Sequence, residues 1–197
     1  MIFKRKIYDE LLRWKRTDEG RTAVLIQGAR RVGKSTVAEE FATNEYDTHI
    51  LVDFAACSSE IRDLFNDVSD LNRIFMRLQL EYGIELRERK SVIIFDEVQL
   101  APKARQAIKY LVKDGRYDYI ETGSLISIRK NVKDILIPSE EVKLHMYPMD
   151  YEEFKWALGD TATINLLQGC FHNRTSLGDA TNRKLMRDFR LYMLIGS

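Results

Sequence analysis

The sequence predicts an α/β fold built on a mostly parallel five-stranded sheet with helices on both faces. Short apolar runs that suit buried strands alternate with longer stretches of helical periodicity, and no hairpin signal joins two strands. The strands are expected at 22–27, 49–54, 91–96, 117–122 and 143–148. The last strand alternates more than the others between apolar and polar residues, which is typical of a strand at the edge of a sheet.

Helical segments are expected between and around these strands. Pro102 suits the first turn of the helix after the third strand, and Gly115 suits its end. The apolar pattern of 58–80 breaks near Ser69 and Asp70, which favours two consecutive helices there. The remaining helices are expected over 5–16, 34–43, 151–158 and 183–194, with a polar loop over 173–182.

Composition places the chain among ordinary soluble globular proteins. Of its 197 residues, 45% are hydrophobic and 31% are charged, and the net charge of +1 does not indicate a general affinity for nucleic acid. No apolar run approaches the roughly 20 residues that span a bilayer, so no membrane partner and a cytoplasmic location are expected. Cys57 and Cys170 lie far apart in no ligand-like spacing, as in a reduced protein without a zinc site.

A glycine-rich stretch lies between the first expected strand and a helix. Its spacing, G-x-x-x-x-G-K-S, is that of the Walker A phosphate loop. Glycines let the backbone approach an anion, successive N–H groups form an anion nest, and the helix beginning near Lys34 adds the positive end of its dipole. The candidate nucleotide-binding residues are therefore Gly28, Ala29, Arg30, Arg31, Val32, Gly33, Lys34, Ser35 and Thr36.

Three residues of this loop have individual expected roles. Lys34 would reach the β- and γ-phosphate oxygens of a nucleotide, and Ser35 would give its hydroxyl to Mg²⁺. Thr36 would lie near the α-phosphate. The alternative is a glycine-bearing turn that matches the motif by chance.

Two carboxylates end the third apolar run. Asp96 matches the Walker B aspartate, so that Ser35 and Asp96 form the expected metal-binding pair. Glu97 is then placed to orient or deprotonate an attacking water. The two motifs together predict ATP and Mg²⁺ as ligands, whereas the simpler alternative is a strand followed by two solvated acids.

Four motifs in this order resemble those of the AAA+ ATPases, in particular an archaeal and bacterial group with a C-terminal domain of unknown function. They lie at 28–36, 95–99, 121–124 and 147–154. The resemblance implies a three-layer P-loop NTPase in which the strand ending at Thr122 separates the Walker A and Walker B strands. It also implies an ATPase domain with an N-terminal helix over 1–158, and a helical extension over 159–197 that begins a truncated lid region.

The resemblance assigns further roles and leaves two departures. Thr122 or Ser124 would sense the γ-phosphate and join Lys34 and Glu97 as catalytic residues, the alternative being a hydroxyl that caps a strand end. Gln99 matches the Asp-Glu-x-Gln pattern of the family without a defined role. The chain ends where relatives continue. The stretch 137–141 also lacks their arginine, for which Arg129 and Arg116 are the substitutes considered, although surface solvation is the preferred interpretation of both.

The expected activity is Mg²⁺-dependent ATP hydrolysis that drives a conformational switch. The alternatives are a nucleotide-binding regulatory module with little hydrolysis, and a P-loop kinase, against which Glu97 favours water as the phosphate acceptor. A protein partner or a second copy of the chain is a further expected ligand. A nucleic-acid partner rests only on a basic face of the last helix, for which a solvated face is the preferred interpretation; its residues are Arg183, Lys184, Arg187 and Arg190.

Overall fold

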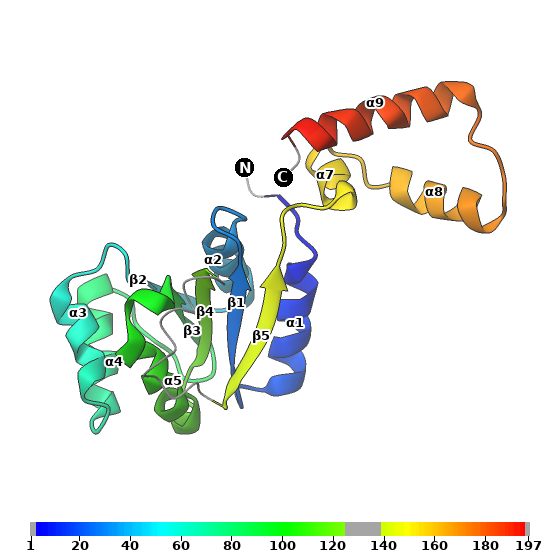
Figure 1. Cartoon of the computed structure of the whole chain (residues 1–197). Coiled ribbons are helices and arrows are strands. Elements are labelled where there is room, and N and C mark those ends of the chain that lie inside the picture. The colour runs from blue at the N-terminus through cyan, green and yellow to red at the C-terminus, as the bar shows by residue number, and fades with distance from the viewer. Residues whose placement is uncertain (1–2, 125–138, 196–197) are drawn as a thin grey trace. The chain divides into compact units, whose positions relative to one another are not determined.

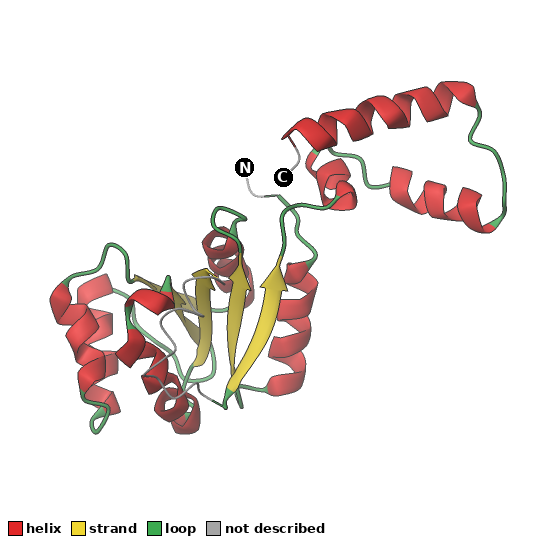
Figure 2. Cartoon of the chain, in the orientation of Figure 1, coloured by secondary structure: helices red, strands yellow, loops and turns green. Residues whose placement is uncertain are grey.

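The computed structural model describes residues 3–124 and 139–195. The chain divides into two compact units: the sheet unit, Ile7–Met146, and the helical unit, which combines Met1–Lys6 with Tyr147–Ser197. Figure 1 labels the elements of both units, and Figure 2 colours them by secondary structure. No helix within 3–124 or 139–195 is long and apolar enough to cross a membrane.

Five strands form one sheet within the described residues. They are β1 (Ala23–Gly28), β2 (Thr48–Asp53), β3 (Ser91–Asp96), β4 (Asp118–Ser124) and β5 (Glu141–Met146). Their order is β2-β3-β4-β1-β5, and every pairing is parallel. The predicted α/β class with a parallel five-stranded sheet is therefore confirmed, as is the position of β4 between β1 and β3.

The strand register places the ends of the strands at one edge of the sheet. Gly28 at the end of β1 pairs with Ser124 of β4 and Met146 of β5. Asp96 at the end of β3 pairs with Asp53 of β2. Because the strands are parallel, the glycine-rich loop and the acidic end of β3 share the carboxyl edge, where ligands bind in open α/β sheets.

Helices cover both faces of the sheet and complete three layers (Figure 2). One face carries α1 (Ile7–Asp18) and α2 (Lys34–Glu45), and the other carries α3 (Ser59–Asp63), α4 (Leu71–Tyr82) and α5 (Pro102–Asp114). The two predicted helices within 58–80 are present, and Asp70 caps the second by accepting a hydrogen bond from the Arg73 backbone. Pro102 begins α5, and Gly115 ends it in the left-handed conformation.

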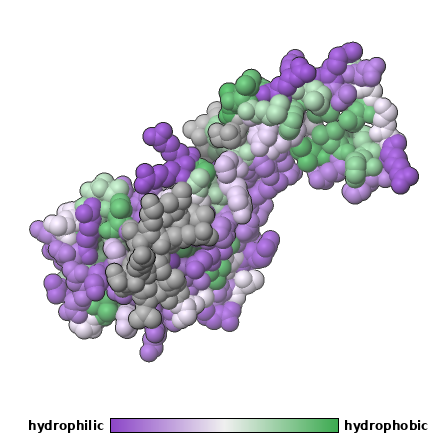
Figure 3. Space-filling model, viewed as in Figure 1, coloured by the Kyte–Doolittle hydropathy of each residue, from purple (hydrophilic) through white to green (hydrophobic). Residues whose placement is uncertain are grey.

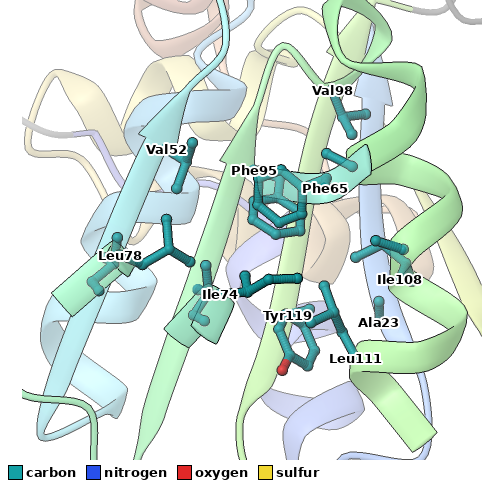
Figure 4. Packing of buried hydrophobic residues seen from close by; sticks show 14 of the residues in the cluster. Ala23, Val52, Phe65, Ile74, Leu78, Phe95, Val98, Ile108, Leu111 and Tyr119 are labelled. Atoms are coloured by element: carbon teal, nitrogen blue, oxygen red, sulfur yellow. The ribbon is translucent and has the colours of Figure 1, made fainter. Parts of the chain in front are cut away.

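The apolar strands supply two hydrophobic clusters, one on each face. In β1, Ala23 and Leu25 join the cluster under α4 and α5, and Val24 and Ile26 join the cluster under α1 and α2. This two-sided burial explains why β1 and β3 read as continuous apolar runs. Figure 4 shows the first cluster, in which the Phe65 and Phe95 rings pack edge to face with centroids 5.2 Å apart.

Three helices form the body of the helical unit: α7 (Tyr151–Ala157), α8 (Thr163–His172) and α9 (Asp179–Ile195). Asp150 and Glu153 form a capping box at the start of α7. Lys155, although its side chain is buried, forms ion pairs with Asp160 at 2.9 Å and with Asp188 of α9 at 3.0 Å. These contacts fix α7 against α9.

In the helical unit, α8 and the start of α9 differ from the sequence prediction. No helix was predicted over 163–172, where the structure has α8, and α9 begins at Asp179 rather than at Arg183. No residue of α8 is buried, and Leu166 and Phe171 are exposed. Figure 3 shows hydrophobic residues over this part of the chain. Gly169 lies inside α8, where glycine is unfavourable, and this residue weakened the helical signal of the segment.

Two elements, β5 and α1, have bounds that differ from those predicted from the sequence. The fifth strand was predicted over 143–148, but β5 runs from Glu141, which pairs with Ala23, to Met146. Pro148 has no N–H group to extend the ladder. The first helix begins at Ile7 rather than at residue 5, because Arg5 and Lys6 instead contact Tyr147, Asp150 and Glu153 within the helical unit.

Candidate functional site

The loop after β1 has the backbone that the glycine pattern predicts. Gly33, the N-cap of α2, has φ 94° and ψ 23°, a left-handed conformation that favours glycine, and Arg31 is also left-handed with φ 66°. Gly28 is required for a different reason, because a Cβ there would lie 2.1 Å from the carbonyl oxygen of Met146 in β5. Gly33 therefore serves the turn, and Gly28 serves the close approach of two strands.

The first turn of α2 begins in this loop without a side-chain cap. The first amide groups of a helix have no intrahelical partner, and Gly33 provides no side chain to bond them. The amide of Val37 closes the first helical hydrogen bond, to the Gly33 carbonyl at 3.0 Å. The preceding amides and the positive end of the helix dipole form a site suited to an anion.

Lys34 lies folded into the loop. Its residue is 5% exposed, and Nζ donates to the carbonyl oxygens of Ala29 at 2.8 Å and Gly28 at 3.5 Å. Burial lowers the pKa of Lys34 below its ordinary value, while Glu97 and Asp96 act in the opposite direction. The loop carbonyls thereby hold the ammonium group where it feels the charges of Asp96 at the end of β3 and of Glu97 after it.

Ser35, Asp96 and Thr122 converge at the carboxyl edge. The Ser35 hydroxyl donates to Asp96 Oδ1 at 2.6 Å, and the Thr122 hydroxyl donates to the same oxygen. Asp96 is 8% exposed and Thr122 is fully buried. A hydroxyl and a carboxylate are hard oxygen donors of the kind that Mg²⁺ takes in phosphate sites, so the residues present fit this ion.

Glu97 follows in a left-handed conformation, with φ 53° and ψ 44°. Its backbone N–H donates to Thr122 Oγ1 at 3.2 Å. Its side chain is partly exposed, and Oε2 accepts a hydrogen bond from the amide Nε2 of Gln99. The two adjacent carboxylates thus have different partners, Gln99 for Glu97 and the hydroxyls of Ser35 and Thr122 for Asp96.

The other predicted loop residues are mostly exposed to solvent. Ala29, Arg30, Arg31 and Thr36 are exposed, and Val32 is partly buried against the cluster under α1 and α2.

The two sensor candidates differ in their contacts. Thr122 contacts both Asp96 and Glu97, whereas no hydrogen bond joins Ser124 to either residue. Ser124 is buried at the end of β4, opposite Gly28. Of the two hydroxyls that the sequence suggested, Thr122 is the one that the structure brings into the site.

The two arginine candidates are not at this edge. Arg116 lies just before β4, where it forms an ion pair with Asp114 at 2.7 Å and donates to Asn72. That position is at the amino ends of the strands, away from Asp96, so Arg116 does not lie in the site of its own chain. Arg129 and residues 137–138 lie outside the described residues.

A buried charge cluster between α5 and the sheet was not predicted. Arg105 of α5 forms an ion pair with Glu141 at 3.1 Å and lies 3.9 Å from the carboxyl group of Glu121, and all three side chains are nearly inaccessible. Burial raises the pKa of Glu121 well above its ordinary value, Glu141 raises it further, and Arg105 opposes this shift. The only signal in the sequence was one acid inside the strand that ends at Thr122.

Comparisons with known proteins give one family and a set of distant structures. The model of the family described as AAA domain matches residues 20–155. No curated protein matches the sequence. Solved structures include the Thermotoga maritima RuvB Holliday junction branch migration motor, at 14% identity and a TM-score of 0.45, over 80% of this chain and 51% of that one.

Two further structures show a similar degree of likeness. The Candida albicans Pif1 helicase has 13% identity and a TM-score of 0.44, over 95% of this chain and 48% of that one. C. elegans PCH-2 has 11% identity and a TM-score of 0.42, over 75% of this chain and 44% of that one. The chain thus matches about half the length of these proteins.

Proposed function

Because this chain belongs to the AAA domain family, with 20–155 matching its model, we propose that it binds ATP and Mg²⁺ and hydrolyses the ATP to drive a conformational switch. The observation that carries the proposal is the 2.6 Å hydrogen bond between Ser35 and Asp96, which unites the phosphate loop with the acidic end of β3. Either sequence motif alone could match its pattern by chance. Their meeting at one edge of the sheet supports a single site.

Binding would involve the loop amides, the α2 N-terminus and Lys34. These groups supply unpaired N–H donors and a buried ammonium to the phosphate oxygens of the nucleotide. Ser35 and Asp96 would hold Mg²⁺, which neutralises charge on the phosphates when bound.

Hydrolysis would depend on Glu97. Its carboxylate is partly exposed beside the metal pair and would orient or deprotonate water for attack on the γ-phosphate. Thr122 would couple Asp96 to Glu97, since its hydroxyl contacts both. Lys34 would stabilise charge that develops on the transferred phosphoryl group.

The test compares two variants by nucleotide binding and by steady-state release of phosphate. Lys34→Ala should abolish ATP binding, whereas Glu97→Gln should retain binding and lose hydrolysis. Glu81→Gln, an exposed carboxylate of α4, is the control and should behave as the wild type in both assays. If Glu97→Gln releases phosphate at the wild-type rate, the assignment of the base is wrong.

A regulatory module with little hydrolysis is the second candidate. No hydrogen bond or ion pair joins an arginine of the described residues to Ser35, Asp96 or Glu97, and such a cation accelerates phosphoryl transfer strongly when it is supplied. Slow turnover of the chain alone is therefore expected. A protein partner or a second copy that raises the rate would favour the ATPase, and a rate that stays at background would favour the module.

A further inference from the structure

Gln99 occupies a fixed place beside the candidate base. It lies in the 3-10 turn Val98–Leu100, is 5% exposed, and donates its side-chain amide to Glu97 Oε2. Backbone hydrogen bonds from Leu100 to Glu97 at 2.9 Å and from Ala101 to Val98 at 3.0 Å close this turn. A buried amide on a turn closed by backbone hydrogen bonds is a donor held in place by the structure around it.

Glu97 needs such a donor. Its left-handed backbone, which costs on the order of 1 kcal/mol in a residue other than glycine, follows directly on the end of β3 at Asp96. The backbone itself is held by the bond from its N–H to Thr122. The partly exposed carboxylate, in contrast, has several rotatable bonds that the fold alone does not fix.

We propose that Gln99 is a positioning residue that sets the direction of the Glu97 carboxylate. This inference rests on the proposed function of Glu97 as the base. Of the two carboxylate oxygens of Glu97, only Oε2 accepts a hydrogen bond from a described residue, so Oε1 is available to a water molecule. Gln99 thereby selects one side-chain orientation and presents the second oxygen to the attacking water, without touching nucleotide or metal itself.

The competing role for Gln99 is packing alone. Gln99→Met separates the two roles, because Met keeps the length of the side chain but has no N–H to donate. Gln99→Glu is the second variant, since it keeps the shape and replaces the donor with a like charge. A packing role predicts that Met is tolerated, and a positioning role predicts that neither variant is.

The experiment measures kcat, KM and the dissociation constant of a fluorescent ATP analogue with Mg²⁺. For both variants we expect kcat to fall by about ten- to a hundred-fold while the dissociation constant is unchanged, because only the water-directing oxygen moves. In a Glu97→Gln background, Gln99→Met should cause no further loss, since the group on which it acts is already removed. Gln79→Ala, which removes a hydrogen-bonded glutamine from α4, is the control and should retain kcat.

A second readout needs no nucleotide. The side-chain amide nitrogen of Gln99, observed by NMR in the labelled protein, should shift in Glu97→Ala, because its acceptor is lost, and should not shift in Glu81→Ala. A wild-type kcat in Gln99→Met would overturn the positioning role alone. So would a Gln99 side-chain amide signal that does not shift in Glu97→Ala. A wild-type protein that binds ATP but releases no phosphate overturns the proposed hydrolysis and the role of Gln99 together.

Discussion

The hydroxyl of Ser35 donates to Oδ1 of Asp96 across 2.6 Å, although 61 positions separate the two residues in sequence. Ser35 lies in α2, which follows β1, and Asp96 ends β3; these two strands are not neighbours, since β4 lies between them. The contact forms because the first turn of α2 starts above the end of β1, and Thr122 at the end of β4 meets Asp96 from the intervening strand. The strand order therefore builds the candidate metal pair.

The first prediction concerns the metal. Ser35→Ala should remove most of the gain in ATP affinity that Mg²⁺ provides and leave the affinity in excess chelator unchanged, because the loop amides and Lys34 remain. Titration of a fluorescent ATP analogue with Mg²⁺ or with EDTA measures both. Thr43→Ala, which removes an exposed hydroxyl farther along α2, is the matched control. An equal Mg²⁺ effect in Ser35→Ala and wild type would remove Ser35 from the metal site.

The second prediction concerns Thr122. Thr122→Val keeps the shape of the side chain but leaves the Glu97 N–H without its acceptor and removes one of the two hydroxyl donors to Asp96 Oδ1, Ser35 being the other. The free energy of unfolding should fall by about 1–3 kcal/mol, the usual effect of a buried polar group left unpaired. Urea denaturation measures this loss, and Thr122→Ser, which restores the hydroxyl, should recover part of it. Equal stability of the Val and Ser variants would show that the two hydrogen bonds contribute nothing.

The third prediction separates two glycines. Gly28→Ala should lower the free energy of unfolding by about 1–3 kcal/mol, since its Cβ would meet the backbone of Met146, which cannot turn aside as a side chain can. Gly169→Ala in α8, where a Cβ meets nothing within 4 Å, should be neutral or stabilising. Urea denaturation of both variants tests the comparison. A Gly28→Ala protein as stable as Gly169→Ala contradicts the close approach of β1 and β5.

Much of the fold was predictable because its signals are local. The apolar runs of β1 and β3 end in motifs whose chemistry requires one shared edge, so the meeting of Ser35 with Asp96 was predictable, whereas the place of β4 between β1 and β3 came from the family resemblance. The helix α8 was not predicted; Gly169 lies within it, and glycine is unfavourable in the interior of a helix. The end of β5 depended on its pairing with β1, which the alternation of its own residues did not reveal.

The finer parts of the site depend on conformation rather than on residue type. The left-handed turn at Glu97 and the bond from Gln99 involve residues two positions apart, yet their pattern alone specified no contact. The choice between Thr122 and Ser124 depended on which hydroxyl reaches Asp96. The contacts of Arg105 with Glu121 and Glu141 join α5, β4 and β5, three elements whose juxtaposition only the folded sheet establishes.

The last prediction concerns the pH dependence of stability at Glu121. Burial, the largest cause, and the neighbouring Glu141 raise the pKa of this carboxyl well above its ordinary value of 4.5, against the opposing charge of Arg105. Lys143, which pairs with Glu141 at 3.7 Å, also contacts the cluster. The folded protein therefore retains at Glu121 a proton that the unfolded chain releases above pH 4.5.

The sign follows from that difference in bound protons. As the pH rises from 4.5 toward the raised pKa, the unfolded state binds fewer protons at Glu121 than the folded state, so this residue makes stability fall by at most about 1.4 kcal/mol per pH unit. Glu121→Gln is neutral at every pH and should lose that component of the decline. Urea denaturation from pH 4.5 to 8 measures it, with Glu81→Gln as the exposed control. If the stability curves of Glu121→Gln and wild type run parallel over this range, Glu121 is not protonated in the folded protein.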